Sequence, residues 1–184
     1  MKKLLLLFVI SSLLPLAMVA QSLRGLDKSP LDIAYFPDNF AHDRKAGEKA
    51  IIKVTYSRPA KNGRDVFGQL VPYGKVWRTG ANEATEIKVY QTITLGDQKL
   101  KRGTYSLFTL PGETEWEIII SKDLDYWGAY SYEQSHDVFR TKVPAGKSDQ
   151  TVENFTIQFK LLGTGKAVMT LAWDKTIVEV PVSF

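Results

Sequence analysis

Short runs in which apolar and polar residues alternate, each ended by a turn, recur along this sequence and restrict its fold more than any other feature. Ile52, Val54 and Tyr56 alternate with lysine and threonine, and the segment 155–161 alternates in the same way. A two-residue repeat places the apolar side chains on one face of a strand. No long stretch has the spacing of an amphipathic helix. The pattern therefore predicts a protein built almost entirely from β-strands.

Other segments are rich in β-branched and aromatic residues and lie between turn signals, which is typical of strands. They are residues 86–89, 93–95, 99–101, 104–110, 116–120, 168–173 and 176–182, with a weaker candidate at 138–143. Gly96 predicts a hairpin turn, Asp174 and Lys175 predict a turn before the last strand, and short helices at 81–85 or 132–137 are compatible with the pattern. The sequence predicts an all-β, single-domain β-sandwich, or a related barrel, of roughly seven to nine mostly antiparallel strands.

The first residues have the features of an export signal. Lys2 and Lys3 precede an apolar run, and Ala20 is a small residue suited to cleavage. This run is shorter than the roughly 20 residues that cross a bilayer. We therefore expect residues 1–20 to be a signal peptide, the mature protein to be periplasmic or secreted, and no transmembrane helix to remain after processing. An uncleaved membrane anchor is the alternative.

Charge and cysteine content exclude several classes of function. The chain has 24 basic and 20 acidic residues. Loss of Lys2 and Lys3 brings these closer to balance, and the basic residues are scattered, so we expect no nucleic-acid partner. The sequence contains no cysteine, which removes disulfides, thiol catalysis and thiolate metal sites. It also has no phosphate loop, dinucleotide fingerprint or paired-histidine zinc motif, so we expect no cofactor and no metal site.

Two segments before the predicted strand at 86–89 lack a regular pattern. Residues 21–49 are interpreted as an N-terminal arm that precedes a β-sandwich domain at 50–184, and the polar part from Asp32 to Lys49 is predicted to pack loosely. Residues 57–86 form a long connection with many glycines and prolines. Because its apolar residues, such as Val66 and Trp77, would be costly to leave in water, we predict that this loop is ordered against the sheet.

Several strings of this sequence resemble one bacterial family. They are residues 54–59, 63–64, 67–68, 70–85, 103–111, 115–116, 127–129 and 171–173, of which Val76 to Thr85 is the most unusual string. In this order they are similar to the exported family catalogued as domain of unknown function 2911, from about Leu31 to the C-terminus. The resemblance implies the fold and the export, and it implies no activity and no catalytic residues.

Side chains that could bind a ligand are concentrated in the loop 57–86 and in residues 126–132. Arginine presents a planar fork of donors to carboxylate or phosphate groups. Aromatic faces can stack on sugar rings, which is an analogy with other β-sandwich modules. Arg78, Asn82 and Glu86 are expected to lie near one another, with Trp77 on the sheet. The candidate binding residues are Arg58, Arg64, Tyr73, Trp77, Arg78, Asn82, Glu83, Glu86 and Trp127.

A purely structural interpretation of the same residues is also open. The arginines could pair with Asp65, Glu83 and Glu86 inside the loop and hold irregular backbone in place. Trp77 and Trp127 could cover the open ends of the core, because large aromatic side chains contribute much buried area.

Three classes of function remain. The leading hypothesis is an exported binding module whose loops recognise a glycan or a small anionic ligand. The alternative is a structural or assembly component of the cell envelope that binds a protein partner. The third is a carboxylate-based hydrolase that uses Glu83 or Glu86 as acid and base, which a cleft holding both carboxyl groups would favour.

Overall fold

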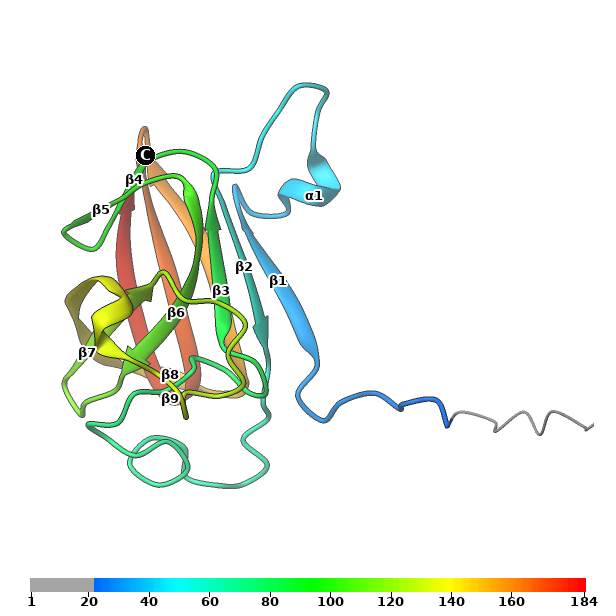
Figure 1. Ribbon diagram of the computed structural model, residues 1–184, viewed down its shortest axis with the longest axis vertical. Coiled ribbons are helices and arrows are strands. Elements are labelled where there is room, and N and C mark those ends of the chain that lie inside the picture. Colours follow the sequence, from blue (N-terminus) through cyan, green and yellow to red (C-terminus); the bar gives the residue numbers. More distant parts are fainter. Residues whose placement is uncertain (1–21) are drawn as a thin grey trace, which may run out of the picture.

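The structure, a computed structural model, describes residues 22–184, so the predicted signal peptide at 1–20 lies outside the described residues. Within residues 22–184, nine antiparallel strands form one sheet in the order β1-β2-β3-β6-β7-β8-β9-β4-β5 (Figure 1). The strands are β1 (Leu31–Phe36), β2 (Ile52–Ser57), β3 (Thr85–Val89), β4 (Ile93–Leu95), β5 (Gln98–Leu100), β6 (Gly103–Leu110), β7 (Glu115–Ser121), β8 (Asp137–Gly163) and β9 (Lys166–Ser183). The helical turns are α1 (Phe40–Asp43) and η1 (Gln134–His136).

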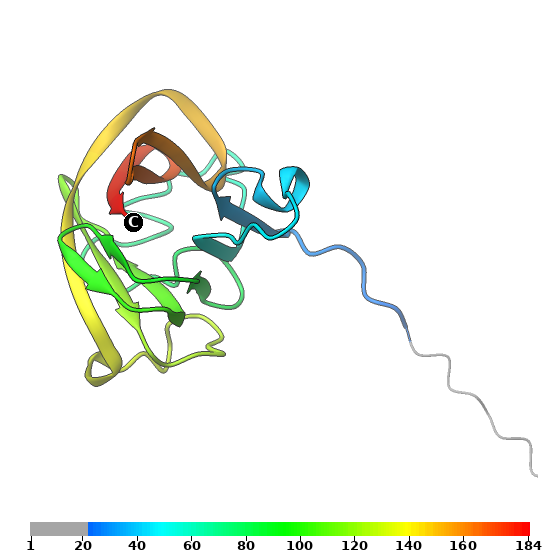
Figure 2. The same ribbon diagram turned by 90° about the horizontal axis from the view of Figure 1, so that it is seen from above.

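Strand β8 turns this sheet into two layers. Its first part, to Pro144, pairs with β7, and its later part, from Ala145, pairs with β9. The register shifts twice between Lys147 and Thr156, and such bulges bend a strand. Figure 2 shows β8 curving from one layer to the other. Because β1 and β5 end the sheet without pairing with each other, the sheet is not closed into a barrel, and the predicted β-sandwich fold is confirmed.

The core forms between the layers from the alternating apolar residues. Examples are Ile52 and Val54 on β2, Phe155 on β8 and Leu171 on β9, each with at most 1% of its surface exposed. At one end of the core lies a cluster of aromatic rings, in which Trp77 stacks on Trp173 with centroids 5.9 Å apart and planes inclined by 17°. The same cluster contains Trp116, Phe67 and Phe155.

This aromatic cluster orders the long loop between β2 and β3. Val66 and Val71 are buried, and Trp77 exchanges two backbone hydrogen bonds with Thr109 of β6, at 2.7 and 2.9 Å. The prediction of an ordered loop is therefore confirmed. Of the two short helices compatible with the sequence, the one within residues 132–137 is present as η1, whereas residues 81–85 form no helix.

The predicted loose arm contains a strand. All six residues of β1 pair with β2, and Phe36 is buried against the core. The prediction of loose packing is wrong for this part of Asp32 to Lys49. Strand β1 differs from the inner strands because it lies at the sheet edge, where Leu31 and Ile33 stay exposed and only Phe36 is buried.

The predicted turn at Asp174 and Lys175 is also wrong. Strand β9 runs through both residues, and Asp174 has a φ of 54° beside a register shift. Aspartate tolerates a positive φ both in turns and in bulges, so its presence in the sequence does not distinguish the two. Asp174 Oδ1 forms an ion pair with Lys61 Nζ at 3.2 Å, which connects this bulge to the long loop. No helix within residues 22–184 is long and apolar enough to cross a membrane.

Candidate functional site

Several candidate residues lie on the loop between β2 and β3, at the lower end of the sandwich in Figure 1, and this loop bonds to the segment 122–133. The amide of Ala84 donates to the carbonyl of Tyr126 at 2.9 Å, and the amide of Gly128 donates to the carbonyl of Asn82 at 2.9 Å. These hydrogen bonds fix the two segments together. One hollow here is lined by Arg78 and another by Asn82, Glu83 and Glu86. A smaller third hollow lies between Arg78 and Tyr130.

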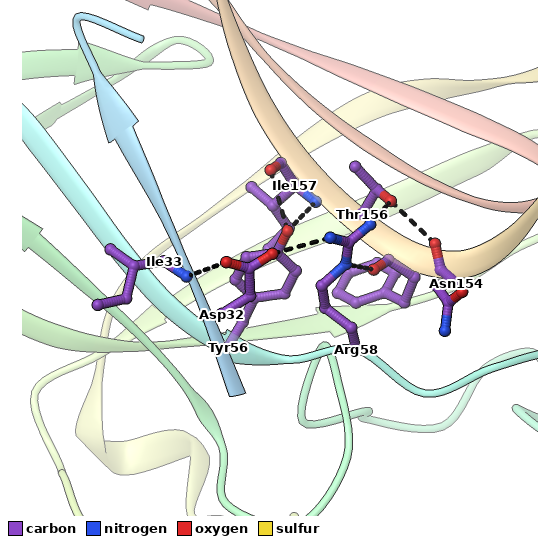
Figure 3. Close-up of polar contacts among 8 residues, drawn as sticks. Asp32, Ile33, Tyr56, Arg58, Asn154, Thr156 and Ile157 are labelled. Carbon is purple, nitrogen blue, oxygen red and sulfur yellow. Dashed lines mark hydrogen bonds and ion pairs between the residues drawn. The ribbon is translucent and has the colours of Figure 1, made fainter. Parts of the chain in front are cut away.

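Arg58 faces neither hollow and joins strands instead. Its Nη1 donates to Asp32 Oδ2 on β1 at 2.8 Å, its Nε donates to the carbonyl of Phe155 at 3.1 Å, and its Nη2 donates to Thr156 Oγ1 at 2.9 Å (Figure 3). Beside it, Tyr56 OH donates to the carbonyl of Ile157. Each nitrogen of the guanidinium has a protein acceptor, so Arg58 stabilises the fold.

We call this contact the seam, defined by Asp32, Tyr56, Arg58, Thr156 and Ile157. Tyr56 OH also accepts a hydrogen bond from the amide of Ile157 at 3.0 Å. Burial raises the pKa of Tyr56 above its ordinary value, so the hydroxyl stays neutral. The seam closes the side of the sandwich where β1 and β2 approach β8.

The basic hollow has a volume of about 280 Å³ and is lined by the cationic side chains of Arg64, Lys75 and Arg78. Its apolar surface includes Trp77 and Trp173. None of the described residues that line it is acidic. The basic hollow thus combines positive charge with an aromatic wall.

Arg78 is held differently from Arg58. Its Nε is buried and has no hydrogen-bond partner within residues 22–184. It forms no ion pair within that range either. Its Nη1 lies close to Gly128, because a Cβ atom added to that glycine would be only 2.9 Å from this nitrogen. Arg64, by contrast, donates to the carbonyls of Lys61 and Ala60 and so supports the loop.

The interpretation that the arginines pair with acidic residues of the same loop is wrong. Among residues 22–184, neither Asp65 nor Glu83 nor Glu86 forms an ion pair. The reason is that Arg58 pairs with Asp32 on β1, whereas Arg64 donates to backbone carbonyls of its own loop.

The second hollow, which we call the Trp127 hollow, has a volume of about 470 Å³. Asp27, Asn82, Glu83 and Glu86 supply its polar groups, with Arg24 at one side. Parts of β2, from Thr55 to Ser57, also line it. Within the described residues it therefore holds more acidic than basic groups.

Trp127 stands at this hollow with 61% of its surface exposed. The interpretation that Trp127 covers the core is therefore wrong, whereas Trp77, at 9%, does pack into the core as predicted. An isolated antiparallel backbone bridge pairs Trp127 with Glu83, and directly opposed residues of such a pair carry their side chains on the same face. Backbone hydrogen bonds on both sides of Trp127, at Tyr126 and Gly128, hold its backbone in place, and its exposed indole is available for stacking.

A polar network supports the backbone around Trp127. Tyr126 OH donates to Asp123 Oδ2 at 2.6 Å, and His136 Nδ1 lies 2.7 Å from the same oxygen. The hydrogen bond to Asp123 raises the pKa of Tyr126 to about 12, and the bond from Tyr126 lowers the pKa of Asp123. Near neutral pH this network keeps Tyr126 neutral and Asp123 charged.

The structure divides the set of predicted residues. Asn82, Glu83, Glu86 and Trp127 line the Trp127 hollow, whereas Arg64, Trp77 and Arg78 line the basic hollow. Tyr73 is 39% exposed and packs over Gly68, and it lines neither hollow.

Sequence reasoning missed Lys75 and Asp27. Lys75 stands inside the string 70–85 and could have been added as a further basic residue of the loop. Asp27 lies in a segment without any pattern, so nothing in the sequence indicated that it would form a wall of the Trp127 hollow. Within residues 22–184, no three histidine, aspartate or glutamate side chains are grouped as a metal ion would require.

Comparisons with known proteins agree with the resemblance noted from the sequence. Neither the curated proteins nor the solved structures give a match to this chain. A family model does match residues 38–182, which is most of the chain. The chain belongs to the family described as protein of unknown function (DUF2911).

Proposed function

We propose that the protein is an exported binding module that holds a glycan in the Trp127 hollow. The observation that carries this proposal is the exposed indole of Trp127, fixed at the wall of a hollow with polar groups around it. The volume of about 470 Å³ lies within the range of about 300 to 1,000 Å³ that is common for small-molecule sites. Export rests on the signal peptide predicted at residues 1–20.

The chemistry of the hollow suits a sugar ring. The flat, apolar face of an indole packs on the C–H face of a pyranose and buries area from both. Carboxylates accept hydrogen bonds from hydroxyl groups, and such charge-assisted bonds are stronger than neutral ones. Glu83, Glu86 and Asp27 supply the carboxylates, and the amide of Asn82 can both donate and accept. Because acidic groups predominate, neutral glycans are favoured over acidic ones.

A glycan array followed by calorimetric titration of the best ligand tests this function. We expect Trp127→Ala to weaken binding by roughly tenfold or more, because the stacking surface is lost. Tyr130→Ala is the matched control, since Tyr130 is 83% exposed in the same segment but does not line the Trp127 hollow. The proposal fails if no glycan binds, or if both variants bind as the unaltered protein does.

Hydrolysis is a second candidate function, because Glu83 and Glu86 line the same hollow. Two carboxyl groups on either side of a glycosidic bond can act as acid and base. Incubation with the glycans that bind, followed by measurement of newly formed reducing ends, tests it. If the protein is a hydrolase, both Glu83→Gln and Glu86→Gln should lose the release of product while still binding. Intact glycan after long incubation with the unaltered protein would exclude hydrolysis of that ligand.

A further inference from the structure

We infer that the basic hollow is a second binding site, separate from the Trp127 hollow, and that its ligand is a small oxyanion such as a phosphate or a carboxylate. Arg64, Lys75 and Arg78 line the hollow, and no acidic side chain among the described residues does so. Like charges gathered around a concave surface raise the local concentration of counter-ions. The sign of the charge therefore selects an anion.

Arg78 supplies the second and independent observation. The Nε atom of this half-buried arginine has lost its hydration and has gained no protein hydrogen bond in return. It also has no carboxylate partner within residues 22–184. An anion in contact with this guanidinium restores the missing electrostatic partner, and guanidinium bonds to phosphate or carboxylate are strong and directional.

The local backbone fixes the position of Arg78. Its carbonyl accepts a hydrogen bond from the amide of Thr85 at 3.1 Å. The neighbouring residues Trp77 and Thr79 are buried, and Thr79 Oγ1 bonds to Thr109 Oγ1 at 3.1 Å. The side chain therefore starts from a rigid point, which lowers the entropy lost when it binds a ligand.

The walls and the volume of the hollow limit the size and polarity of the compound that carries the oxyanion. Trp77 and Trp173 form an aromatic wall below the charged rim, and the volume is about 280 Å³. This space fits a small group and leaves apolar area for a short organic body. The expected ligand is a small phosphorylated or carboxylated compound rather than an extended polyanion.

The experiment is a thermal-shift and calorimetric titration of residues 21–184 with inorganic phosphate, and separately with acetate and citrate. Salt at physiological strength limits weak surface attraction, because the Debye length is then only about 8 Å. We expect at least one of these oxyanions to raise the midpoint of thermal unfolding and to give saturable heat. The separate titrations distinguish a phosphate site from a carboxylate site. Absence of a response to all three overturns the inference.

Matched variants locate the binding. Arg78→Gln should weaken affinity by about tenfold or more, because a charge-assisted pair is removed. Arg102→Gln makes the same change at an exposed arginine that lines neither hollow, and it should leave affinity unchanged. Lys75→Gln, at an exposed position, provides a second test if Arg78→Gln folds poorly. Equal losses in the variants of Arg78 and Arg102 would show non-specific attraction and overturn the site.

Trp127→Ala separates this inference from the proposed glycan site. The variant should keep full affinity for the oxyanion, because Trp127 does not line the basic hollow. Loss of oxyanion binding in this variant would mean that the two hollows act as one site, and the inference of a separate site would be wrong.

Discussion

Arg58 and Arg78 lie in the same irregular loop, but the seam and the basic hollow use them in opposite ways. Arg58 bonds through Nε, Nη1 and Nη2 to three different residues of β1 and β8. Arg78 has a buried Nε without a partner and no ion pair within residues 22–184. A concentration of arginines in a loop therefore has two meanings, and only the contacts of each side chain distinguish structural support from a binding surface.

The largest expected effect is at Trp173, which lines the basic hollow and packs against Phe155, whose carbonyl accepts a hydrogen bond from Arg58. The Trp173 ring stacks on Trp77 beneath the basic hollow, and its Nε1 donates to the carbonyl of Glu153 on β8 at 3.1 Å. Trp173→Ala should lower the free energy of unfolding by about 4 kcal/mol, because it opens a cavity in the aromatic cluster. Urea denaturation measures this. A loss below about 1 kcal/mol would mean that the cluster does not hold the loop.

Removal of Arg58 tests the structural side of the comparison. Arg58→Ala should lower the free energy of unfolding by about 2 kcal/mol, because three acceptors lose a charged donor. The ion pair with Asp32 adds little, since 33% and 43% of the two side chains are exposed. Arg78→Ala, measured by the same denaturation, should change stability by less than about 0.5 kcal/mol, because no protein partner is lost. Equal losses in the two variants would remove the distinction between the arginines.

A smaller change in the seam sharpens the same point. Tyr56→Phe keeps the buried ring and removes only the hydroxyl that bonds to both backbone groups of Ile157. The expected loss is about 1 kcal/mol, as is usual for a buried neutral hydrogen bond. Native-state hydrogen exchange should also become faster at the Ile157 amide. Unchanged exchange there would show that the seam does not depend on this hydroxyl.

The smallest expected effect concerns pH. Tyr126 has a pKa raised to about 12 by its hydrogen bond to Asp123, and Tyr132 has a pKa raised to about 12 by burial and by its bond to Asp137. Because the folded state favours the protonated phenols, this stabilisation is complete below pH 10 or so and decreases as the pH rises towards about 12. An ultraviolet absorbance titration should resolve late-ionising tyrosines that disappear in Tyr126→Phe and Tyr132→Phe.

The strands with clear alternation were predictable, whereas the bends were not. Residues 52–56 and 155–159 place every second side chain in the core, so their pattern reports the fold directly, whereas Leu161 continues the alternation but is exposed. Asp174 and Lys175 are typical turn residues, but pairing on both sides keeps them within β9, where Asp174 with its positive φ lies in a bulge. The edge strand β1 buries mainly Phe36, which leaves too little pattern to recognise.

For the candidate site, the loop and its residue types were predictable, but the contacts of each side chain were not. The loop 57–86 does contain most of the predicted residues that line the two hollows, whereas Asp27, Trp127 and Trp173 come from other segments. Which arginine binds a ligand was not predictable, because the partners of Arg58 lie 26, 97 and 98 residues away in the sequence. Contacts over such separations depend on how the layers meet, and local pattern carries no information about them.

The most direct test compares the two arginines within one sample by their Nε–H signals in a nitrogen-15 NMR spectrum during titration with phosphate. Our account predicts that the Arg78 signal shifts with saturation, while the Arg58 signal, whose proton is donated to the Phe155 carbonyl, stays in place and exchanges slowly with water. Parallel shifts of both signals, or movement of Arg58 alone, would contradict the account.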